Sequence, residues 1–150
     1  MDIFSCVDAY GQNKALNIIK DIFSGYTLNI EQHIEDKGRV DILMTATTKN
    51  KEYYYAIECK DRYFPHNHYD DMMIEVNKYN TLKDYSSLGY KPIYLNTFSD
   101  DTYLIWNLNT CVKKEGYKTA KKTTVVEGEP VNRLRYFLPV SGYTFSGYTK

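Results

Sequence analysis

The chain has 150 residues, of which 43% are apolar, and its equal numbers of acidic and basic side chains give a formal net charge of zero. This length suits a single domain with its own core, and no apolar run is long enough to cross a bilayer. The sequence shows no secretory signal, and its three cysteines, Cys6, Cys59 and Cys111, are far apart. These features argue against disulfides and structural zinc, and they favour reduced thiols in a cytoplasmic setting.

Charge is distributed unevenly along the chain. Residues 1–112 carry 11 Lys and Arg against 16 Asp and Glu, a net charge of −5, whereas residues 113–150 carry 8 against 3, a net charge of +5. A basic segment beside an acidic body would suit a substrate with a phosphate backbone, although a solvated lysine-rich surface is the alternative. We therefore expect a core over residues 1–112 and a basic C-terminal extension over residues 113–150, within one domain.

The first predicted element is a helix within residues 4–23. Apolar side chains recur at helical spacing from Ala15 to Phe23, and Gly25 follows as a stop signal. The region of Gly11 is compatible with a loop, so the helix could begin near residue 4 or only near Gln12. In residues 26–32 apolar and polar side chains then alternate, which predicts a strand.

Two apolar runs in the middle of the chain predict a β-hairpin. Residues 39–46 and 53–60 are rich in apolar, β-branched or aromatic side chains, and the polar residues 47–52 separate them. Two such runs joined by a short polar segment are typical of antiparallel neighbours. The hairpin is the centre of the functional prediction because of the charged side chains that it carries.

Charged side chains interrupt these apolar runs at Asp41, Glu58 and Lys60. With the turn centred on residues 49 and 50, Asp41 lies opposite Glu58 or Cys59, and alternation places Glu58 and Lys60 on one face. Burying two carboxylates costs on the order of several kcal/mol unless a counter-charge compensates them. Mg²⁺ would do so, because it binds carboxylate oxygens and leaves positions for water and phosphate. The alternative is a surface hairpin in which Glu58 and Lys60 form a solvated ion pair.

The pattern Asp41…Glu58-Cys59-Lys60 resembles the signature of the PD-(D/E)XK nuclease superfamily, with Val40 in place of the Pro. The resemblance extends over about residues 4–108, where the predicted helices and strands follow one another in the order of the superfamily's core. It implies a restriction-endonuclease-like α/β fold, with a mixed central sheet flanked by helices and an αβββαβ core, here followed by a C-terminal β extension. It also implies that Asp41, Glu58 and the backbone carbonyl of Cys59 bind Mg²⁺ or Mn²⁺, and that Lys60 positions the attacking water.

The resemblance suggests auxiliary residues around this site. Family members often carry an acidic residue on the first helix, and Asp8 is the acidic candidate, although the usual position falls on residues 12–14 and a surface or capping role is the alternative. His33 could approach from the neighbouring strand, or it could be an ordinary hydrogen-bonded surface histidine. The helix after the Glu-X-Lys strand often contributes one more polar residue. Glu75 and Lys78 are the candidates, and a surface pair is the alternative.

Residues 61–68 contain Pro65 and a polar cluster, which predicts a loop over the mouth of the site. Arg62 and His66 in this segment are candidates for substrate contacts, as is Lys78 beyond it. Residues 69–88 predict a helix, because their apolar side chains recur at helical spacing and Gly89 follows.

Residues 91–96 and 103–108 predict further strands, the first joined to the hairpin by a helix in the manner of a βαβ crossover. The lysine-rich residues 113–122 predict a loop or flexible arm, and residues 125–126 and 134–140 predict two short strands. The last ten residues contain Ser-Gly-Tyr-Thr twice. A disordered tail, a tail that stacks bases on its tyrosines and a tail that docks on a partner all remain open.

The leading functional prediction is a divalent-metal-dependent endonuclease that cuts phosphodiester bonds, and the resemblance favours DNA over RNA. Abundant Tyr, Asn, Lys and Ile with scarce Arg suggest an AT-rich bacterial or phage genome, hence the cytoplasm of a bacterium or of a phage-infected cell. No membrane partner is expected, and a homodimer is compatible with the resemblance. The alternatives are a non-catalytic nucleic-acid-binding, virion or complex component on the same fold, and an assembly protein without a nucleic-acid partner.

Overall fold

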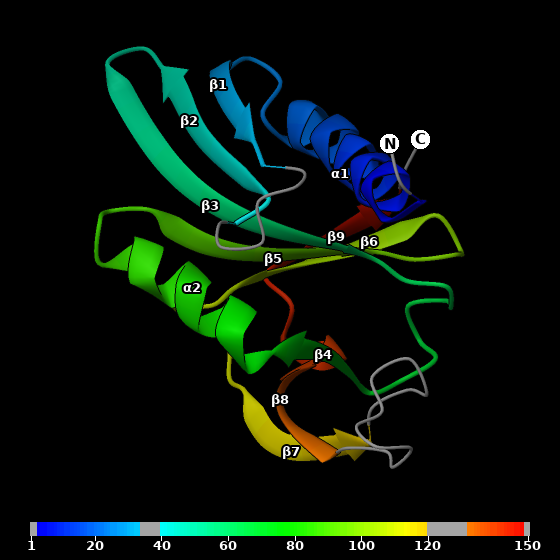
Figure 1. The fold of residues 1–150 in the computed structure, drawn as a ribbon. Helices are drawn as coiled ribbons and strands as arrows, with labels where there is room; N and C mark the ends of the chain where they lie inside the picture. The colour runs from blue at the N-terminus through cyan, green and yellow to red at the C-terminus, as the bar shows by residue number, and fades with distance from the viewer. Residues whose placement is uncertain (1–2, 34–39, 120–131, 149–150) are drawn as a thin grey trace.

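A six-stranded mixed sheet runs through the molecule, and a three-stranded sheet lies beside it (Figure 1). The computed structural model describes residues 3–33, 40–119 and 132–148. Its elements, in chain order, are α1 (Ile3–Ile22), β1 (Thr27–Gln32), β2 (Ile42–Thr48), β3 (Lys51–Asp61), β4 (Asp71–Glu75), α2 (Val76–Ser86), β5 (Lys91–Thr97), β6 (Thr102–Asn107), β7 (Lys114–Thr119), β8 (Asn132–Pro139), η2 (Val140–Gly142) and β9 (Phe145–Tyr148). Among these helices, none is long and apolar enough to span a membrane.

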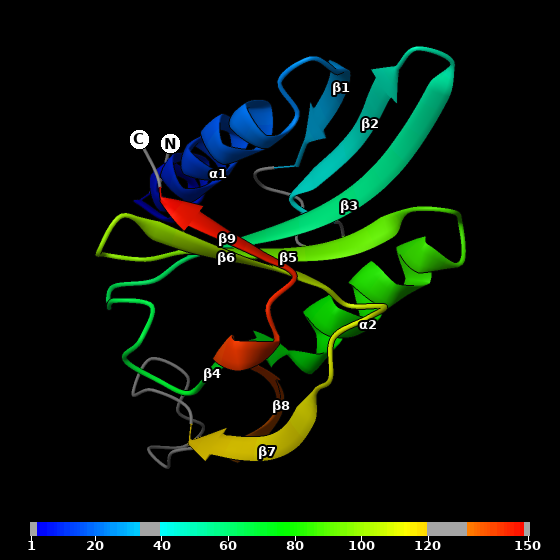
Figure 2. The same ribbon diagram turned by 180° about the vertical axis from the view of Figure 1, so that it is seen from behind.

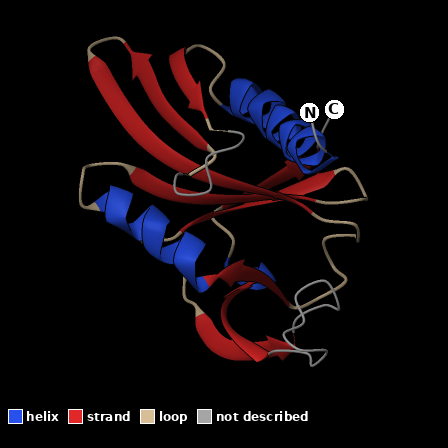
Figure 3. Ribbon diagram, in the orientation of Figure 1, coloured by secondary structure: helices blue, strands red, loops and turns tan. Residues whose placement is uncertain are grey.

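The main sheet has the strand order β1-β2-β3-β5-β6-β9, and the two helices cover its opposite faces (Figure 3). Strands β3 and β5 are parallel, as the predicted crossover requires, and the other neighbours are antiparallel. Ile18 and Ile19 of α1 pack in one buried cluster with β2 and β3, whereas Leu82 of α2 packs in a second cluster with Trp106. The predicted mixed central sheet flanked by helices is therefore confirmed.

The predicted hairpin is present, and its tight turn fixes its register. Thr48 pairs with Lys51, so the turn is made by Lys49 and Asn50, and Lys49 has a φ of 51° in the left-handed region. From this turn the antiparallel pairing runs back to Ile42 opposite Ile57. One further step places Asp41 opposite Glu58, the first of the two predicted positions.

The prediction of one helix over residues 69–88 is wrong in its first part. Residues 71–75 form strand β4, and α2 begins only at Val76. Met72 and Ile74 alternate inward and are almost fully buried, while β4 pairs along its length with β8, whose partner residues lie 60 to 68 positions later. The backbone hydrogen bonds of a distant partner strand thus outweigh the helical spacing of the apolar side chains.

The prediction of a loop or flexible arm over residues 113–122 is also wrong for residues 114–119. They form β7, which pairs with β8 in the three-stranded sheet β4-β8-β7. Gly116 permits this packing, because a Cβ there would lie 2.9 Å from Phe137 Cε2. The predicted strand over residues 134–140 corresponds to β8, and the one over residues 125–126 lies outside the described residues.

The C-terminal segment returns to the main sheet. Strand β9 pairs with β6 and forms one edge of the six-stranded sheet, as Figure 2 shows from behind. Trp106 on β6 is fully buried, as a core residue should be, and its Nε1–H group donates to the carbonyl of Pro139 at 3.0 Å. The residues after position 113 therefore contribute strands to both sheets.

Candidate active site

Asp41 and Glu58 meet at the open end of the hairpin, as the register requires. The backbone N–H of Asp41 donates to Glu58 Oε1 at 3.2 Å, and the backbone N–H of Cys59 donates to Asp41 Oδ2 at 2.8 Å. Each carboxylate thus accepts a hydrogen bond from the strand that carries the other. Glu58 is only 5% exposed, and Asp41 is half-buried. A solvated surface pair does not describe this arrangement.

The electrostatic environment disfavours two negative charges in this place. The pKa of Glu58 is raised from 4.5 to about 7, first by burial and then by the negative charge of Asp41. The positive charge of Lys78 and the hydrogen bonds to the carboxylate act in the opposite direction. The ionised pair therefore has an uncompensated electrostatic cost at neutral pH, and a cation bound between its oxygens would offset that cost.

Lys78 supplies the cationic side chain that the structure brings to Glu58. Its Nζ atom lies 3.3 Å from Glu58 Oε2, and it reaches the strand from the first turn of α2. Burial lowers the pKa of Lys78, but the charges of Glu58, Glu75 and Asp41 together raise it above its usual value. Of the predicted candidates on the second helix, Lys78 contacts the acidic pair. Glu75 is exposed at the N-terminal end of α2.

Gln12 is a site residue that the sequence analysis missed. Its side chain is 2% exposed, and its Nε2 atom donates to Asp41 Oδ1 at 3.3 Å and to the carbonyl of His33 at 3.5 Å. Its Oε1 atom accepts from Gln32 Nε2 at 3.1 Å. The available signal is its position, because Gln12 lies where the resemblance places an acidic residue on the first helix.

Lys60 lies two residues beyond Glu58 on β3, so alternation directs it to the same face, and its side chain is exposed. Cys59 points to the other face and packs in the cluster beneath α1. Burial, followed by the charge of Asp41, raises the pKa of the Cys59 thiol well above its usual value. The thiol is therefore a core group, whereas the backbone of Cys59 takes part in the site.

The remaining predicted candidates lie around or away from the acidic pair. The backbone N–H of His33 donates to the carbonyl of Asp41 at 2.7 Å, while its ring contacts the carbonyl of Val40 and the carboxylate of Glu31. Asp8 lies within α1, but its side chain is outside the described part of the structure.

The side chains of Arg62 and His66, which the sequence predicts as substrate contacts, bond to other parts of the protein. The Arg62 guanidinium donates to Asn96 Oδ1 at 2.8 Å, to the carbonyl of Met73 at 2.6 Å and to the hydroxyl of Tyr94 at 3.0 Å. These bonds tie β4 to β5. His66 pairs with Asp100, with 2.6 Å between Nδ1 and Oδ2, in a separate pocket beside β6 and β9.

The donor set fits a hard divalent cation with few protein ligands. Within the described ranges, no group of three or more His, Cys, Asp and Glu side chains is placed to hold a metal. Asp41 and Glu58 nevertheless bring two carboxylates together, and burial and the negative charge of Asp41 raise the pKa of Glu58. Mg²⁺ and Mn²⁺ suit such a site, since Mg²⁺ in particular commonly takes one or two carboxylates and keeps several waters.

Comparisons with known proteins show the family and the fold of the chain. A family model described as the PD-(D/E)XK nuclease superfamily matches residues 9–103. Among solved structures, the chain is similar to Hjc from Archaeoglobus fulgidus, a Holliday junction resolvase from an archaeal hyperthermophile, with a TM-score of 0.53 and 11% sequence identity. The match covers 93% of this chain and 91% of that chain, and it confirms the predicted fold class. The search of curated proteins gives no match.

Proposed function

The chain belongs to the PD-(D/E)XK nuclease superfamily, and from this we propose that it is a divalent-metal-dependent endonuclease that hydrolyses phosphodiester bonds in DNA. The observation that carries the proposal is the meeting of Asp41 and Glu58 in a buried setting that disfavours their joint ionisation. A nuclease of this superfamily uses such a pair of carboxylates to hold its cation.

In this proposal, Asp41 and Glu58 hold Mg²⁺ or Mn²⁺ together with the backbone carbonyl of Cys59. The cation would polarise the scissile phosphate and lower the pKa of a bound water. The amide of Gln12 and the N–H of Cys59 fix the two oxygens of Asp41. The ammonium of Lys78 favours the ionised form of Glu58.

Lys60 is the proposed residue that positions the attacking water and offsets charge that develops on the phosphate. Its place on the same face of β3 as Glu58, at the solvent-exposed end, supports this role. Arg62 and His66 have no part in this site, because their side chains bond to Asn96 and to Asp100.

DNA is the proposed substrate class because the superfamily resemblance favours it and because the similar solved structure is named as a resolvase of Holliday junctions. The proposed setting is the cytoplasm of a bacterium or of a phage-infected cell. A homodimer is part of the same proposal, and gel filtration with light scattering would test it.

The experiment is a cleavage panel with linear, supercoiled, single-stranded and four-way-junction DNA and with RNA, each in Mg²⁺, in Mn²⁺ and in EDTA. We expect cleavage of at least one DNA only with a cation, and a loss of at least about 100-fold in Glu58→Gln and in Lys60→Ala. Glu52→Gln, an exposed carboxylate on the same strand, is the matched control and should keep full activity. Absence of cleavage throughout, or equal cleavage by Glu58→Gln, would overturn the proposal.

A second candidate is a non-catalytic nucleic-acid-binding, virion or complex component on the same fold. Gln12 favours it, because this amide stands where relatives often carry an acidic residue, and so does the engagement of Glu58 by Lys78. The same panel separates the two candidates, since this protein would shift DNA in a gel without cutting it in either cation.

A further inference from the structure

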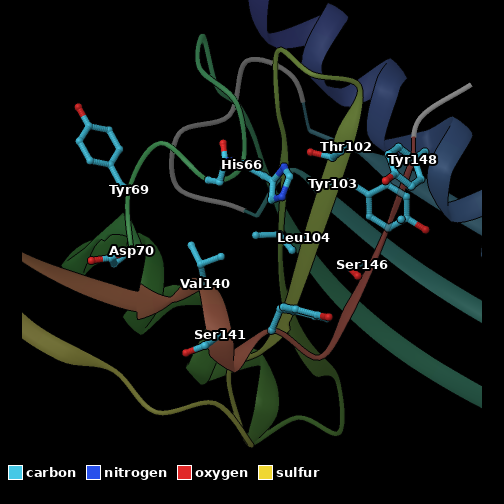
Figure 4. A pocket seen from close by; sticks show the side chains of 13 residues that line it. His66, Tyr69, Asp70, Thr102, Tyr103, Leu104, Val140, Ser141, Ser146 and Tyr148 are labelled. Atoms are coloured by element: carbon cyan, nitrogen blue, oxygen red, sulfur yellow. The ribbon is translucent and has the colours of Figure 1, made fainter.

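A pocket of about 600 Å³ lies at the β6–β9 edge of the main sheet (Figure 4). In the strand order of that sheet, β5 stands between this edge and β3, which carries Glu58. Loop residues 66–70 bound it on one side, and η2 with Tyr143 bounds it on the other. None of its lining residues takes part in the proposed active site. Its size is within the range of pockets that hold a small organic ligand.

Strand alternation decides which side chains of β6 and β9 face this pocket. Thr102 pairs with Tyr148, and Leu104 pairs with Ser146, so these four side chains share one face of the sheet. Tyr103 belongs to the cluster on the other face, beneath α1. Its ring lies over Gly147, where a Cβ would come within 2.5 Å of the hydroxyl.

Aromatic side chains with accessible rings surround the pocket. Tyr69 is 51% exposed, Tyr143 is 45% exposed and Tyr148 is 79% exposed. Figure 4 shows Tyr69 and Tyr148 on opposite sides of the lining, with His66 between them. Leu104 and Val140 add an apolar surface, and Ser141 and Ser146 add hydroxyl groups.

His66 is held in place as part of this wall. Its Nδ1 atom lies 2.6 Å from Asp100 Oδ2, and its backbone N–H donates to the same oxygen at 3.4 Å. The other oxygen of Asp100 accepts from the hydroxyl of Thr102 at 2.5 Å. Because Nδ1 faces Asp100, the opposite ring nitrogen remains directed away from this carboxylate and is suited to a hydrogen bond with a ligand.

The charges of the lining decide what kind of ligand fits. Among the lining residues that the structure describes, none is Lys or Arg, and Asp70 contributes a carboxylate. A site for phosphate groups would need cations, so this one is suited to a neutral ligand with a planar π-face and hydrogen-bonding edges. Given the proposed function, we propose that the pocket binds an unpaired base of a nucleic-acid strand, which stacks on Tyr148 and hydrogen-bonds to His66.

The test is the binding of a fluorescein-labelled deoxyadenosine hexamer, measured by anisotropy in EDTA so that the strand stays intact. A hexamer of abasic sites carries the same backbone without bases. Tyr148→Ala removes an exposed ring from the pocket, and Tyr63→Ala is the matched control, because Tyr63 is 85% exposed and does not line the pocket.

We expect the wild type and Tyr63→Ala to bind the deoxyadenosine hexamer at least about tenfold more tightly than the abasic hexamer. Tyr148→Ala should lose about tenfold for the deoxyadenosine hexamer alone, and the loss should be the same at 50 and 200 mM NaCl, because stacking involves no cation. Free deoxyadenosine should compete, whereas deoxyribose 5-phosphate should not. Tyr143→Ala should weaken the same binding as a second pocket variant.

Equal binding of the two hexamers, or equal affinities of Tyr148→Ala and Tyr63→Ala, would overturn the inference. If the pocket instead holds a peptide side chain, the two hexamers should bind equally well. Cleavage by the Asp41–Glu58 site is measured separately, so base binding without cleavage would contradict the proposed function alone. Cleavage without a contribution from Tyr148 to binding would contradict the pocket alone.

Discussion

The ammonium group of Lys78 lies 3.3 Å from Glu58 Oε2 and links α2 to the buried acidic pair on the hairpin. Glu58 is almost fully buried, whereas the Lys78 side chain is 49% exposed. The lysine thus reaches the site from solvent and compensates part of its charge. Lys78 brings one positive charge to two carboxylates, so a divalent cation bound between them would further offset their negative charge.

Lys78→Met should lower the stability of the metal-free protein at pH 8 by about 1–2 kcal/mol. Loss of one partner leaves the buried carboxylate less compensated, although solvent screening of the exposed lysine limits the effect. Urea unfolding in EDTA measures the difference. Lys83→Met on the same helix is the control, because Lys83 bonds to Asn109 at the surface and should change stability by less than about 0.5 kcal/mol. Equal effects of the two substitutions would contradict the compensating role of Lys78.

The stability of the metal-free protein should fall as the pH rises from about 4.5 to about 7. Because the pKa of Glu58 is raised to about 7 in the folded chain, the folded state binds more protons than the unfolded chain in this window, and unfolding becomes easier with rising pH. The loss is on the order of 3 kcal/mol. Urea unfolding across the window measures it, and Glu58→Gln should flatten the profile. A profile that rises with pH and is unchanged in the variant would contradict this environment for Glu58.

Gln12→Glu should strengthen Mn²⁺ binding and lower the stability of the metal-free protein. The substitution keeps the acceptor for Gln32 but replaces the donor to Asp41 with a third negative charge. We expect Mn²⁺ affinity to rise by about tenfold, the scale of effects around metal ligands. Asn13→Asp adds the same charge on the exposed side of α1 and should leave both quantities unchanged. If Gln12→Glu behaves like Asn13→Asp in calorimetry and urea unfolding, Gln12 has no link to the cation site.

Gly147→Ala should destabilise the protein by about 1–2 kcal/mol. The added Cβ would come within 2.5 Å of the Tyr103 hydroxyl and 2.7 Å of Cζ, so the buried ring must shift or β9 must leave β6. Gly142→Ala is the control, because its nearest neighbours lie at an ordinary 3.6 Å. Thermal unfolding compares the two. Equal melting temperatures would mean that β9 does not hold Tyr103 as described.

The sequence predicted the meeting of Asp41 and Glu58 because its determinants are local. A two-residue turn at Lys49 and Asn50 sets the register, and the apolar runs on both sides mark the strands. Strand β4 escaped prediction because its partner, β8, is distant in sequence and Met72 and Ile74 also fit a helical spacing. Periodicity alone cannot report such a partner.

The polar neighbours of the site were harder to predict than the acids. The contact of Gln12 with Asp41 depends on how α1 packs against the start of β2. An amide is uncharged, so the charge pattern of the sequence does not reveal it. The sequence predicts Arg62 as a substrate contact, whereas its side chain bridges β4 and β5 through bonds to Met73 and Asn96. The pocket at His66 needs β9 in the main sheet, and the repeated Ser-Gly-Tyr-Thr segment left that arrangement open.

The most direct test of the cation site is a calorimetric titration of Mn²⁺ into the wild type, Asp41→Asn and Glu58→Gln at pH 8, which requires no knowledge of the substrate. The two carboxylates acting together predict saturable binding by the wild type and a loss of at least about tenfold in affinity in each variant. Identical isotherms for the three proteins, or no binding by the wild type at millimolar Mn²⁺, would contradict a cation held between Asp41 and Glu58.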